Sequence, residues 1–150
     1  MRILMGWNVG GFRMAALTLL GLILPTAARS DGALAIGMSG DIAKDGLAFG
    51  RSWNYPDRAD AEKRALEQCR SFEDAPQRTR DMCRLLATFK DECIAIVIDP
   101  KAGTPGFGWA VAGNSKTAQE RAMAACRATA GKSREKFCEP DQVKCDGSSK

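Results

Sequence analysis

The sequence of 150 residues contains no histidine. Imidazole is the usual general base of serine and cysteine hydrolases and a common metal ligand. The absence of histidine therefore argues against these hydrolases and against a histidine-bound metal. The sequence also lacks the closely spaced Cys-x-x-Cys pairs of zinc sites and any glycine-rich phosphate-binding motif. We therefore expect no metal and no cofactor, and we expect that the protein is not an enzyme.

Two weaker patterns leave room for catalysis. Ser133 and Lys136 have the Ser-x-x-Lys spacing of a lysine-activated serine, but the companion motifs are missing. Paired carboxylates across a cleft could hydrolyse a glycosidic bond. The carboxylates that could form such pairs stand in a predicted turn or near a predicted helix start: Asp41, Asp45, Asp57, Asp60 and Glu62. Turn formation and helix capping explain these residues more simply, so a small hydrolase of cell-wall or carbohydrate substrates is kept as an alternative.

Residues 1–30 have the order of parts of a secretory signal peptide. Two arginines precede an apolar run at residues 14–24, and a proline and small residues follow it. A membrane anchor is the alternative, but a spanning helix needs about 20 apolar residues, and this run is much shorter. The first cysteine is Cys69, which excludes a lipoprotein. We expect cleavage after Ala28 or after Ser30, a secreted or periplasmic protein, and no stable membrane anchor after cleavage.

Removal of this leader changes the charge of the chain. The leader holds three of the 22 basic residues and none of the 18 acidic ones, so the mature chain has 19 basic residues against 18 acidic residues. A nearly neutral chain has no electrostatic basis for binding a polyanion. We therefore expect no nucleic-acid partner.

An internal repeat organises the mature chain. The segment that begins at Ala33 matches the segment at Cys93, the Phe-Gly pair at Phe49 matches the pair at Phe107, and each pair is followed by a helical segment that ends in cysteine. We expect one compact domain over residues 31–146, built from repeats at about 32–90 and 92–146, with a disordered tail at 147–150.

Each repeat has the same predicted order of elements: strand, strand, helix, strand. Residues 33–38 and 93–98 alternate between bulky and small side chains, which predicts strands. After a turn-rich segment, a second alternating run places Leu47, Phe49 and Trp53 on one face, and Phe107, Trp109 and Val111 on the corresponding face. Helices are expected after Pro56-Asp57 and Asn114-Ser115, because these residues can cap backbone N–H groups.

Residues 73–81 are polar and charged and are predicted to form a solvated loop. Residues 85–89 predict a third strand, and residues 141–145 predict its weaker counterpart. The sequence thus predicts an α+β fold, a tandem repeat of two strand-strand-helix-strand units with antiparallel sheet, stapled by disulfides.

All the cysteines lie in the exported part: Cys69, Cys83, Cys93, Cys126, Cys138 and Cys145. Six cysteines in a small exported domain indicate three disulfides, although 15 pairings exist. We favour Cys69 with Cys83 and Cys126 with Cys138, because each bridge ties a helix end to the strand after it. Cys93 is then left for Cys145.

The mature sequence resembles the exported bacterial family called domain of unknown function 4189. The resemblance rests on Gly-Ala-Leu-Ala-Ile from Gly32, Phe-Gly-Arg-Ser-Trp-Asn-Tyr-Pro from Phe49, the Ala61-Glu-x-x-Ala65-Leu-x-x-Cys69 helix and Phe-Gly-Trp from Phe107. It implies secretion and the tandem fold described above, and it brings no established catalytic residues. The second repeat has Val-Ala-Gly-Asn at 111–114 where the first has Trp-Asn-Tyr-Pro.

Surface aromatics are the best candidates for binding. Trp and Tyr are favoured anchors of interfaces, and loops often contain functional residues. The candidate binding residues are Arg51, Trp53, Tyr55 and Trp109; for Trp53, packing into the core is the simpler interpretation. We expect a non-enzymatic binding module that acts on a protein or an envelope component, for example as an inhibitor or effector. A structural envelope protein is a further alternative.

Overall fold

The computed structural model describes residues 30–150. The predicted leader, except for its last residue, and the cleavage site after Ala28 lie outside the described residues. The elements follow one another along the chain as β1 (Asp31–Met38), α1 (Ile42–Asp45), β2 (Leu47–Tyr55), α2 (Arg58–Arg70), α3 (Gln77–Arg80), β3 (Arg84–Lys90), β4 (Cys93–Ile98), β5 (Phe107–Ala112), α4 (Ser115–Ala130), the 3₁₀ turn η1 (Glu135–Phe137) and β6 (Glu139–Cys145).

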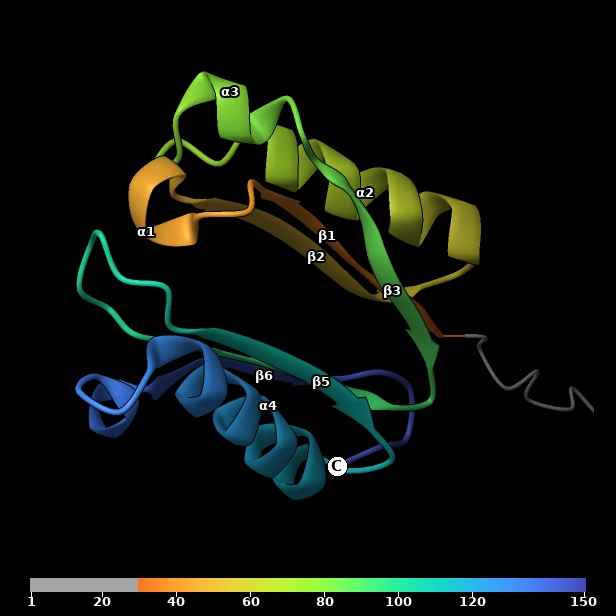
Figure 1. The fold of residues 1–150 in the computed structure, drawn as a ribbon. Coiled ribbons are helices and arrows are strands. Elements are labelled where there is room, and N and C mark those ends of the chain that lie inside the picture. The colour runs from red at the N-terminus through yellow and green to blue at the C-terminus, as the bar shows by residue number, and fades with distance from the viewer. Residues whose placement is uncertain (1–29) are drawn as a thin grey trace, which may run out of the picture.

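The strands form two antiparallel sheets with the same topology, which fits the predicted tandem repeat. Strand order is β2-β1-β3 in the first sheet and β5-β4-β6 in the second. The sheets face each other, α2 covers the outer side of the first and α4 the outer side of the second (Figure 1). The molecule therefore has four layers in the order helix, sheet, sheet, helix, and the predicted α+β class is confirmed.

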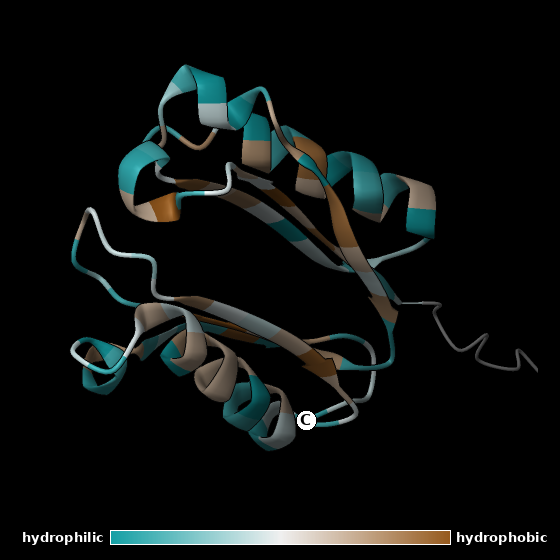
Figure 2. Cartoon of the chain, viewed as in Figure 1, coloured by the Kyte–Doolittle hydropathy of each residue, from teal (hydrophilic) through white to brown (hydrophobic). Residues whose placement is uncertain are grey.

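Alternation along the strands separates small from large side chains. In β1, Ala33 and Ala35 pack against α2, whereas Leu34 and Ile36 point between the sheets. Strand β4 repeats the pattern, with bulky isoleucines between the sheets. The inner strands are accordingly more hydrophobic than the outer faces of the helices (Figure 2). Burial between the sheets thus supplies the main apolar core, because the apolar contribution grows with the area removed from water.

Glycine lets each helix lie directly on its sheet. A Cβ atom added at Gly50 would be 2.1 Å from the carbonyl oxygen of Ala65, and one added at Gly108 would be 2.1 Å from the carbonyl oxygen of Ala122. These two positions correspond in the repeat. Small residues on the helices and glycine on the strands therefore fix the short helix-to-sheet distance in both units.

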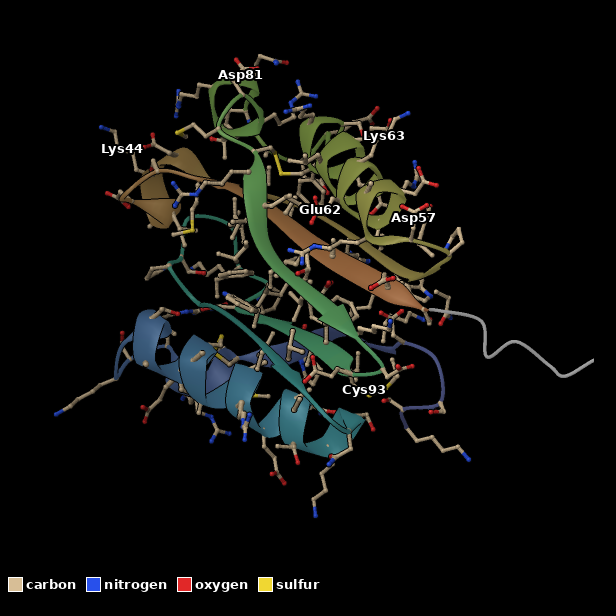
Figure 3. The ribbon with its side chains drawn as sticks, turned by 90° about the vertical axis from the view of Figure 1, so that its right-hand side faces the viewer. Lys44, Asp57, Glu62, Lys63, Asp81 and Cys93 are labelled. Atoms are coloured by element: carbon tan, nitrogen blue, oxygen red, sulfur yellow. A yellow bond between two sulfur atoms is a disulfide. The ribbon has the colours of Figure 1, made fainter. Side chains whose placement is uncertain are left out.

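The caps expected from the sequence are present. Asp57 accepts a hydrogen bond from the backbone N–H of Asp60 at the start of α2, and Asn114 accepts one from the N–H of Thr117 at the start of α4. Each satisfies a donor that the first helical turn leaves unpaired. Asp57, which caps α2, and Lys63, on the polar face of α2, lie on the outside of the molecule (Figure 3).

Three disulfides join the pairs favoured by the sequence: Cys69 with Cys83, Cys126 with Cys138 and Cys93 with Cys145. The first two tie α2 and α4 to the segments that lead into β3 and β6. The third joins the start of β4 to the end of β6, across 52 residues of sequence. Each unit is therefore closed by covalent bonds within itself.

Two expectations need revision. Residues 73–81 are not a solvated loop throughout: they contain α3, and Thr79 is fully buried, with its hydroxyl donating to the carbonyl oxygen of Asp45 at 2.6 Å. Residues 147–150 were predicted to be a disordered tail, but the structure gives them partners. Gly147 N–H donates to Ser30 Oγ at 2.9 Å, and Ser115 N–H donates to the carbonyl of Lys150 at 2.9 Å.

Candidate binding site at the edge of β2 and β6

Strands β2 and β6 lie at the same edge of the sandwich. The ammonium nitrogen of Lys144 on β6 is 5.3 Å from the centroid of the Trp53 ring on β2. Because β1 and β4 are the central strands, β3 and β5 form the opposite edge. The molecule therefore has two comparable edges, one built from β2 and β6 and the other from β3 and β5.

Four side chains of the first edge point toward the space between the sheets. On β2, Arg51 and Trp53 share the face of Phe49, and the guanidinium carbon of Arg51 is 5.4 Å from the centroid of the Phe49 ring. On β6, Val143 packs against the cluster under α4. Since successive side chains of a strand alternate, Gln142 and Lys144 point the other way, toward the first sheet.

Two polar atoms at this edge are buried without a partner. Arg51 Nε and Gln142 Oε1 are shielded from solvent, and neither has a hydrogen-bond partner within residues 30–150. Burial lowers the pKa of the Arg51 guanidinium, and the carboxylate of Asp141 opposes that effect. A buried donor or acceptor without a partner is unfavourable.

A β-bulge separates Tyr55 from the other β2 residues. The pairing with β1 shifts between Asp31 and Ala33, and Asn54 adopts a left-handed conformation with φ of 58°. The extra residue turns Tyr55 toward the α2 side, where it packs on the cluster beneath that helix. Tyr55 and Trp53 therefore flank the edge strand from opposite faces.

A shallow cavity of about 310 Å³ lies where β2 meets α2. We call it the Arg51 pocket. It is lined by residues of β2 and α2: Arg51, Ser52, Trp53, Tyr55, Arg64 and Gln68. The amide oxygen of Gln68 accepts the backbone N–H of Arg51 at 3.0 Å and holds the rim in place. The structure thus brings three of the four predicted binding residues to one pocket, with two further polar residues from α2.

Trp109, the fourth predicted residue, lies elsewhere. It is on β5 at the opposite edge and packs, partly buried, against the core between the sheets. Because Gly50 corresponds to Gly108, Trp109 occupies the position of Arg51, and Val111 that of Trp53. Leu86 and Ala87 of β3 complete an apolar edge. The edge formed by β3 and β5 is therefore filled by apolar side chains, whereas the edge formed by β2 and β6 is basic and aromatic.

Four of the five carboxylates considered for hydrolysis have structural partners. Asp41 caps α1 and Asp57 caps α2. Glu62 pairs with Arg58 at 2.6 Å, and Asp45 pairs with Arg78 at 3.0 Å. The pKa of Asp45 is lowered, chiefly by a hydrogen bond from Ser39. None of them lines the Arg51 pocket.

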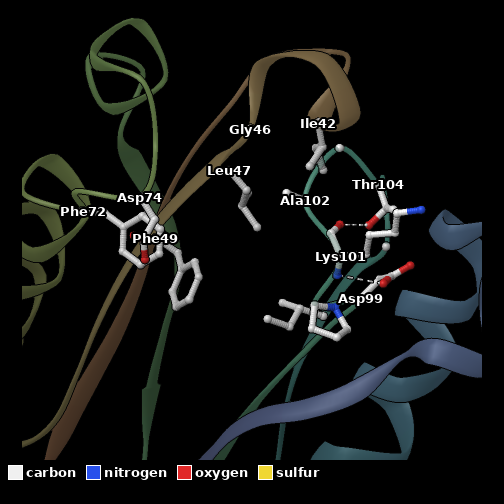
Figure 4. Close-up of a pocket in the computed structure, with 14 residues that line it drawn as sticks. Ile42, Gly46, Leu47, Phe49, Phe72, Asp74, Asp99, Lys101, Ala102 and Thr104 are labelled. Atoms are coloured by element: carbon white, nitrogen blue, oxygen red, sulfur yellow. Dashed lines mark hydrogen bonds between the residues drawn. The ribbon is translucent and has the colours of Figure 1, made fainter.

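A second cavity, of about 260 Å³, lies between the two units at the end of the sandwich near α1 (Figure 4). Phe49, Phe72 and Leu47 line its first-unit side, and the loop from Asp99 to Gly106 lines the other. Asp99 holds this loop: it accepts the N–H of Lys101 at 3.1 Å and two bonds from Arg134 at 2.7 and 2.6 Å. The cavity wall is therefore fixed by one bidentate ion pair.

This ion pair predicts a specific pH dependence of stability. Hydrogen bonding from Arg134 is the main cause that lowers the pKa of Asp99 from 3.8 to about 2. A carboxyl group with a depressed pKa stabilises the fold above its unfolded pKa and loses that contribution as pH falls toward 2. In urea unfolding between pH 5 and pH 2, we expect Arg134→Met to remove part of the acid-induced loss of stability. The exposed neighbour Lys132, changed to Met, is the control; equal pH slopes in the wild type and the Arg134 variant would contradict this assignment.

Sequence reasoning missed the β6 side of the edge and the two α2 residues. Gln142 and Lys144 lie in a segment that was predicted only weakly to be a strand. Because Gln142 and Lys144 are two residues apart, they lie on the same face of a strand. No sequence pattern indicates that β6 lies opposite β2. Arg64 and Gln68 lie on the helix expected after Pro56-Asp57, and only the packing of α2 on β2 brings them to the pocket.

No helix within residues 30–150 has the length and apolar character required to cross a membrane. Comparison with known families finds one match: the family model described as domain of unknown function (DUF4189) matches residues 32–145. No curated protein and no solved structure matches the chain.

Proposed function

The chain belongs to the DUF4189 family, and from its geometry we propose that it is a binding module that holds a carboxylate-bearing peptide group in the Arg51 pocket and along the edge of β2 and β6. It is non-enzymatic in this proposal, and its ligand belongs to a protein or to an envelope component. Three disulfides fit a protein outside the reducing cytosol, and we place it in the periplasm or outside the cell.

The contrast between the two edges supports this proposal most strongly. Both edges are formed by equivalent strands, so packing alone could have filled both with apolar residues. The β3 and β5 edge is filled in this way by Trp109 and Val111. The β2 and β6 edge instead has Arg51 and Gln142 with buried atoms that lack partners. Such groups cost stability, and a bound ligand that pairs with them would offset that cost.

The chemistry of the edge indicates the ligand class. Once a ligand displaces the side chains that cover them, Arg51 Nε–H can donate to a carboxylate and Gln142 Oε1 can accept an N–H, so a group with both functions suits them. A peptide that contains Asp or Glu has a carboxylate near backbone N–H groups. Trp53 and Tyr55 add flat apolar surfaces with polar ends, which are typical of interface anchors.

Binding of a defined acidic peptide tests the proposal. We expect the mature protein to bind an acetylated, amidated tri-glutamate peptide in calorimetric titration, and Arg51→Met to weaken binding at least about tenfold. That factor corresponds to the loss of one hydrogen bond to a charged group. Arg127→Met, on the exposed outer face of α4, is the matched control and is expected to bind normally.

Two results would contradict the proposal. One is equal binding of the tri-glutamine peptide of the same length, because that would show that the carboxylate is not recognised. The other is the absence of saturable binding together with release of products from peptidoglycan or glycans, which would favour the hydrolase alternative.

A further inference from the structure

Three cavities follow one another along β2. The second cavity, near α1, is lined by Leu47 and Phe49. A third cavity, of about 440 Å³, is lined by Phe49 and Arg51, and the Arg51 pocket is lined by Arg51 and Tyr55. Each cavity therefore begins on the strand at a residue that also lines the previous one.

The wall opposite β2 has the same order. Phe72 lines the second and third cavities, Gln68 lines the third cavity and the Arg51 pocket, and Arg64 lines the Arg51 pocket. Helix α2 and the segment after it thus run along β2 in the opposite direction. Because both walls pass from cavity to cavity in one order, the three cavities form one groove from Tyr55 to Leu47, which we call the β2 groove.

The second cavity makes one end of the β2 groove apolar. Ile42, Leu47 and Ile98 line it, and all three are partly buried in the core between the sheets. Leu47 lies on one side of the cavity and the loop of the second unit lies on the other (Figure 4). The loop approaches α1, since a Cβ atom added at Gly103 would be 3.8 Å from the carbonyl oxygen of Ala43. An apolar group bound in this cavity would contact both units.

The charge of the β2 groove changes sign along its length. Arg51 and Arg64 line the Arg51 pocket, whereas the exposed carboxylates of Glu73 and Asp74 line the third cavity. Within residues 30–150, no salt bridge joins Glu73 or Asp74 to a basic side chain. A ligand with a carboxylate at Arg51 and a cation beside Asp74 would therefore be complementary to the groove in charge.

The length of β2 sets the spacing of these ligand groups. Leu47 and Arg51 are four residues apart on one strand. A strand rises about 3.3 Å per residue, so the two positions are about 13 Å apart. An extended peptide has the same rise. Two of its residues that are four positions apart can therefore reach both ends of the groove, and the residue halfway between them lies at the third cavity.

Resting on the proposed function, we infer that the ligand is an extended peptide that fills the whole β2 groove. Its acidic residue lies in the Arg51 pocket, an apolar residue four positions away lies in the second cavity, and a basic residue between them lies beside Asp74. The backbone N–H of Arg51 already donates to the side chain of Gln68 at 3.0 Å. The peptide is therefore recognised at this point by its side chains and not by adding a strand to β2.

A set of acetylated, amidated pentapeptides tests the inference by calorimetric titration of the mature protein. We expect Glu-Gly-Gly-Gly-Leu to bind at least about tenfold more tightly than Glu-Gly-Gly-Gly-Gly, because the leucine side chain is buried on binding. The peptide Glu-Gly-Leu-Gly-Gly has the wrong spacing and is expected to show no gain. Each sequence is also measured in the reverse order, and the tighter direction is used for the variants.

Leu47→Ala assigns the leucine effect to the second cavity. We expect this variant to lose most of the gain from the leucine of the peptide, and to prefer phenylalanine over leucine more strongly than the wild type does, because the cavity is larger. A change of preference distinguishes altered cavity shape from general damage to the fold. Leu85→Ala, at a position on β3 that is 37% exposed, is the matched control and is expected to keep the preference of the wild type.

A lysine at the middle position tests the charge pattern. We expect Glu-Gly-Lys-Gly-Leu to bind about threefold more tightly than Glu-Gly-Gly-Gly-Leu, which is the size of effect typical of an exposed ion pair. Asp74→Asn is expected to reduce this difference and to leave the glycine peptide unaffected. Glu120→Gln, on the exposed face of α4, is the control.

The outcomes separate this inference from the proposed function. If the glycine peptide binds in an Arg51-dependent manner but leucine adds nothing in either direction, the β2 groove is not one site and the proposed function stands. The same conclusion follows if Glu-Gly-Leu-Gly-Gly gains as much as Glu-Gly-Gly-Gly-Leu, or if Leu47→Ala keeps the full gain and the preference of the wild type. If no acidic peptide binds, both the inference and the proposed function are overturned.

Discussion

Replacing both Cys93 and Cys145 with alanine is expected to lower the free energy of unfolding by about 4 kcal/mol. The disulfide spans 52 residues, and in the chain-entropy treatment a cross-link of that length restricts the unfolded chain by roughly that amount. Small domains have a total stability of about 5–15 kcal/mol, so this is a large part of it. Urea unfolding without reductant measures the change.

The disulfide between Cys126 and Cys138 is the matched comparison. It spans 12 residues, and its removal is expected to cost about 3 kcal/mol because the closed loop is shorter. A larger loss from the 12-residue bridge than from the 52-residue bridge would contradict the entropic explanation. It would indicate that packing around α4 dominates instead.

Gly108→Ala is expected to destabilise the protein by about 3 kcal/mol. The added methyl group would lie 2.1 Å from the carbonyl oxygen of Ala122 and 2.3 Å from the backbone nitrogen of Cys126. Both are main-chain atoms of α4, so no side chain can rotate away and the helix itself must move. Overpacking of this kind typically costs about 1–3 kcal/mol, and contact with backbone places this site at the upper end.

Gly113→Ala is the control for that substitution. Gly113 follows the same strand, and a Cβ atom there would have no atom within 4 Å. We expect its stability to stay within about 0.5 kcal/mol of the wild type, as for most surface substitutions. If both alanine variants were equally stable, the close approach of α4 to β5 would not be a constraint in solution.

Local patterns were sufficient to predict the elements of both units. The alternation at Leu34 and Ile36 identified β1, and the side chains of Asp57 and Asn114 marked where the helices begin. Helix α3 was missed because its stability depends on a tertiary contact: Thr79 is buried against the carbonyl of Asp45, which is 34 residues away. The composition of residues 73–81 shows only that the segment is charged, and it does not predict a helix there.

The candidate site was predicted in part, for a comparable reason. Arg51, Trp53 and Tyr55 are neighbours in the sequence and line one pocket. Trp109 was grouped with them because it is an aromatic residue in the matching repeat, but the two-sheet arrangement places it at the opposite edge. Lys144 lies near Trp53 only through the packing of one sheet on the other, which no local pattern encodes.

The placement of bulky residues between the sheets has a consequence for the history of the fold. A shorter chain with a single unit would expose Leu34, Ile36, Phe49 and Phe89 to water. Such a chain could cover them only by meeting another copy of itself, as obligate homodimers do. The present protein has the form of two such subunits fused through the two residues that separate β3 from β4, so an ancestor with a single unit would have formed a homodimer.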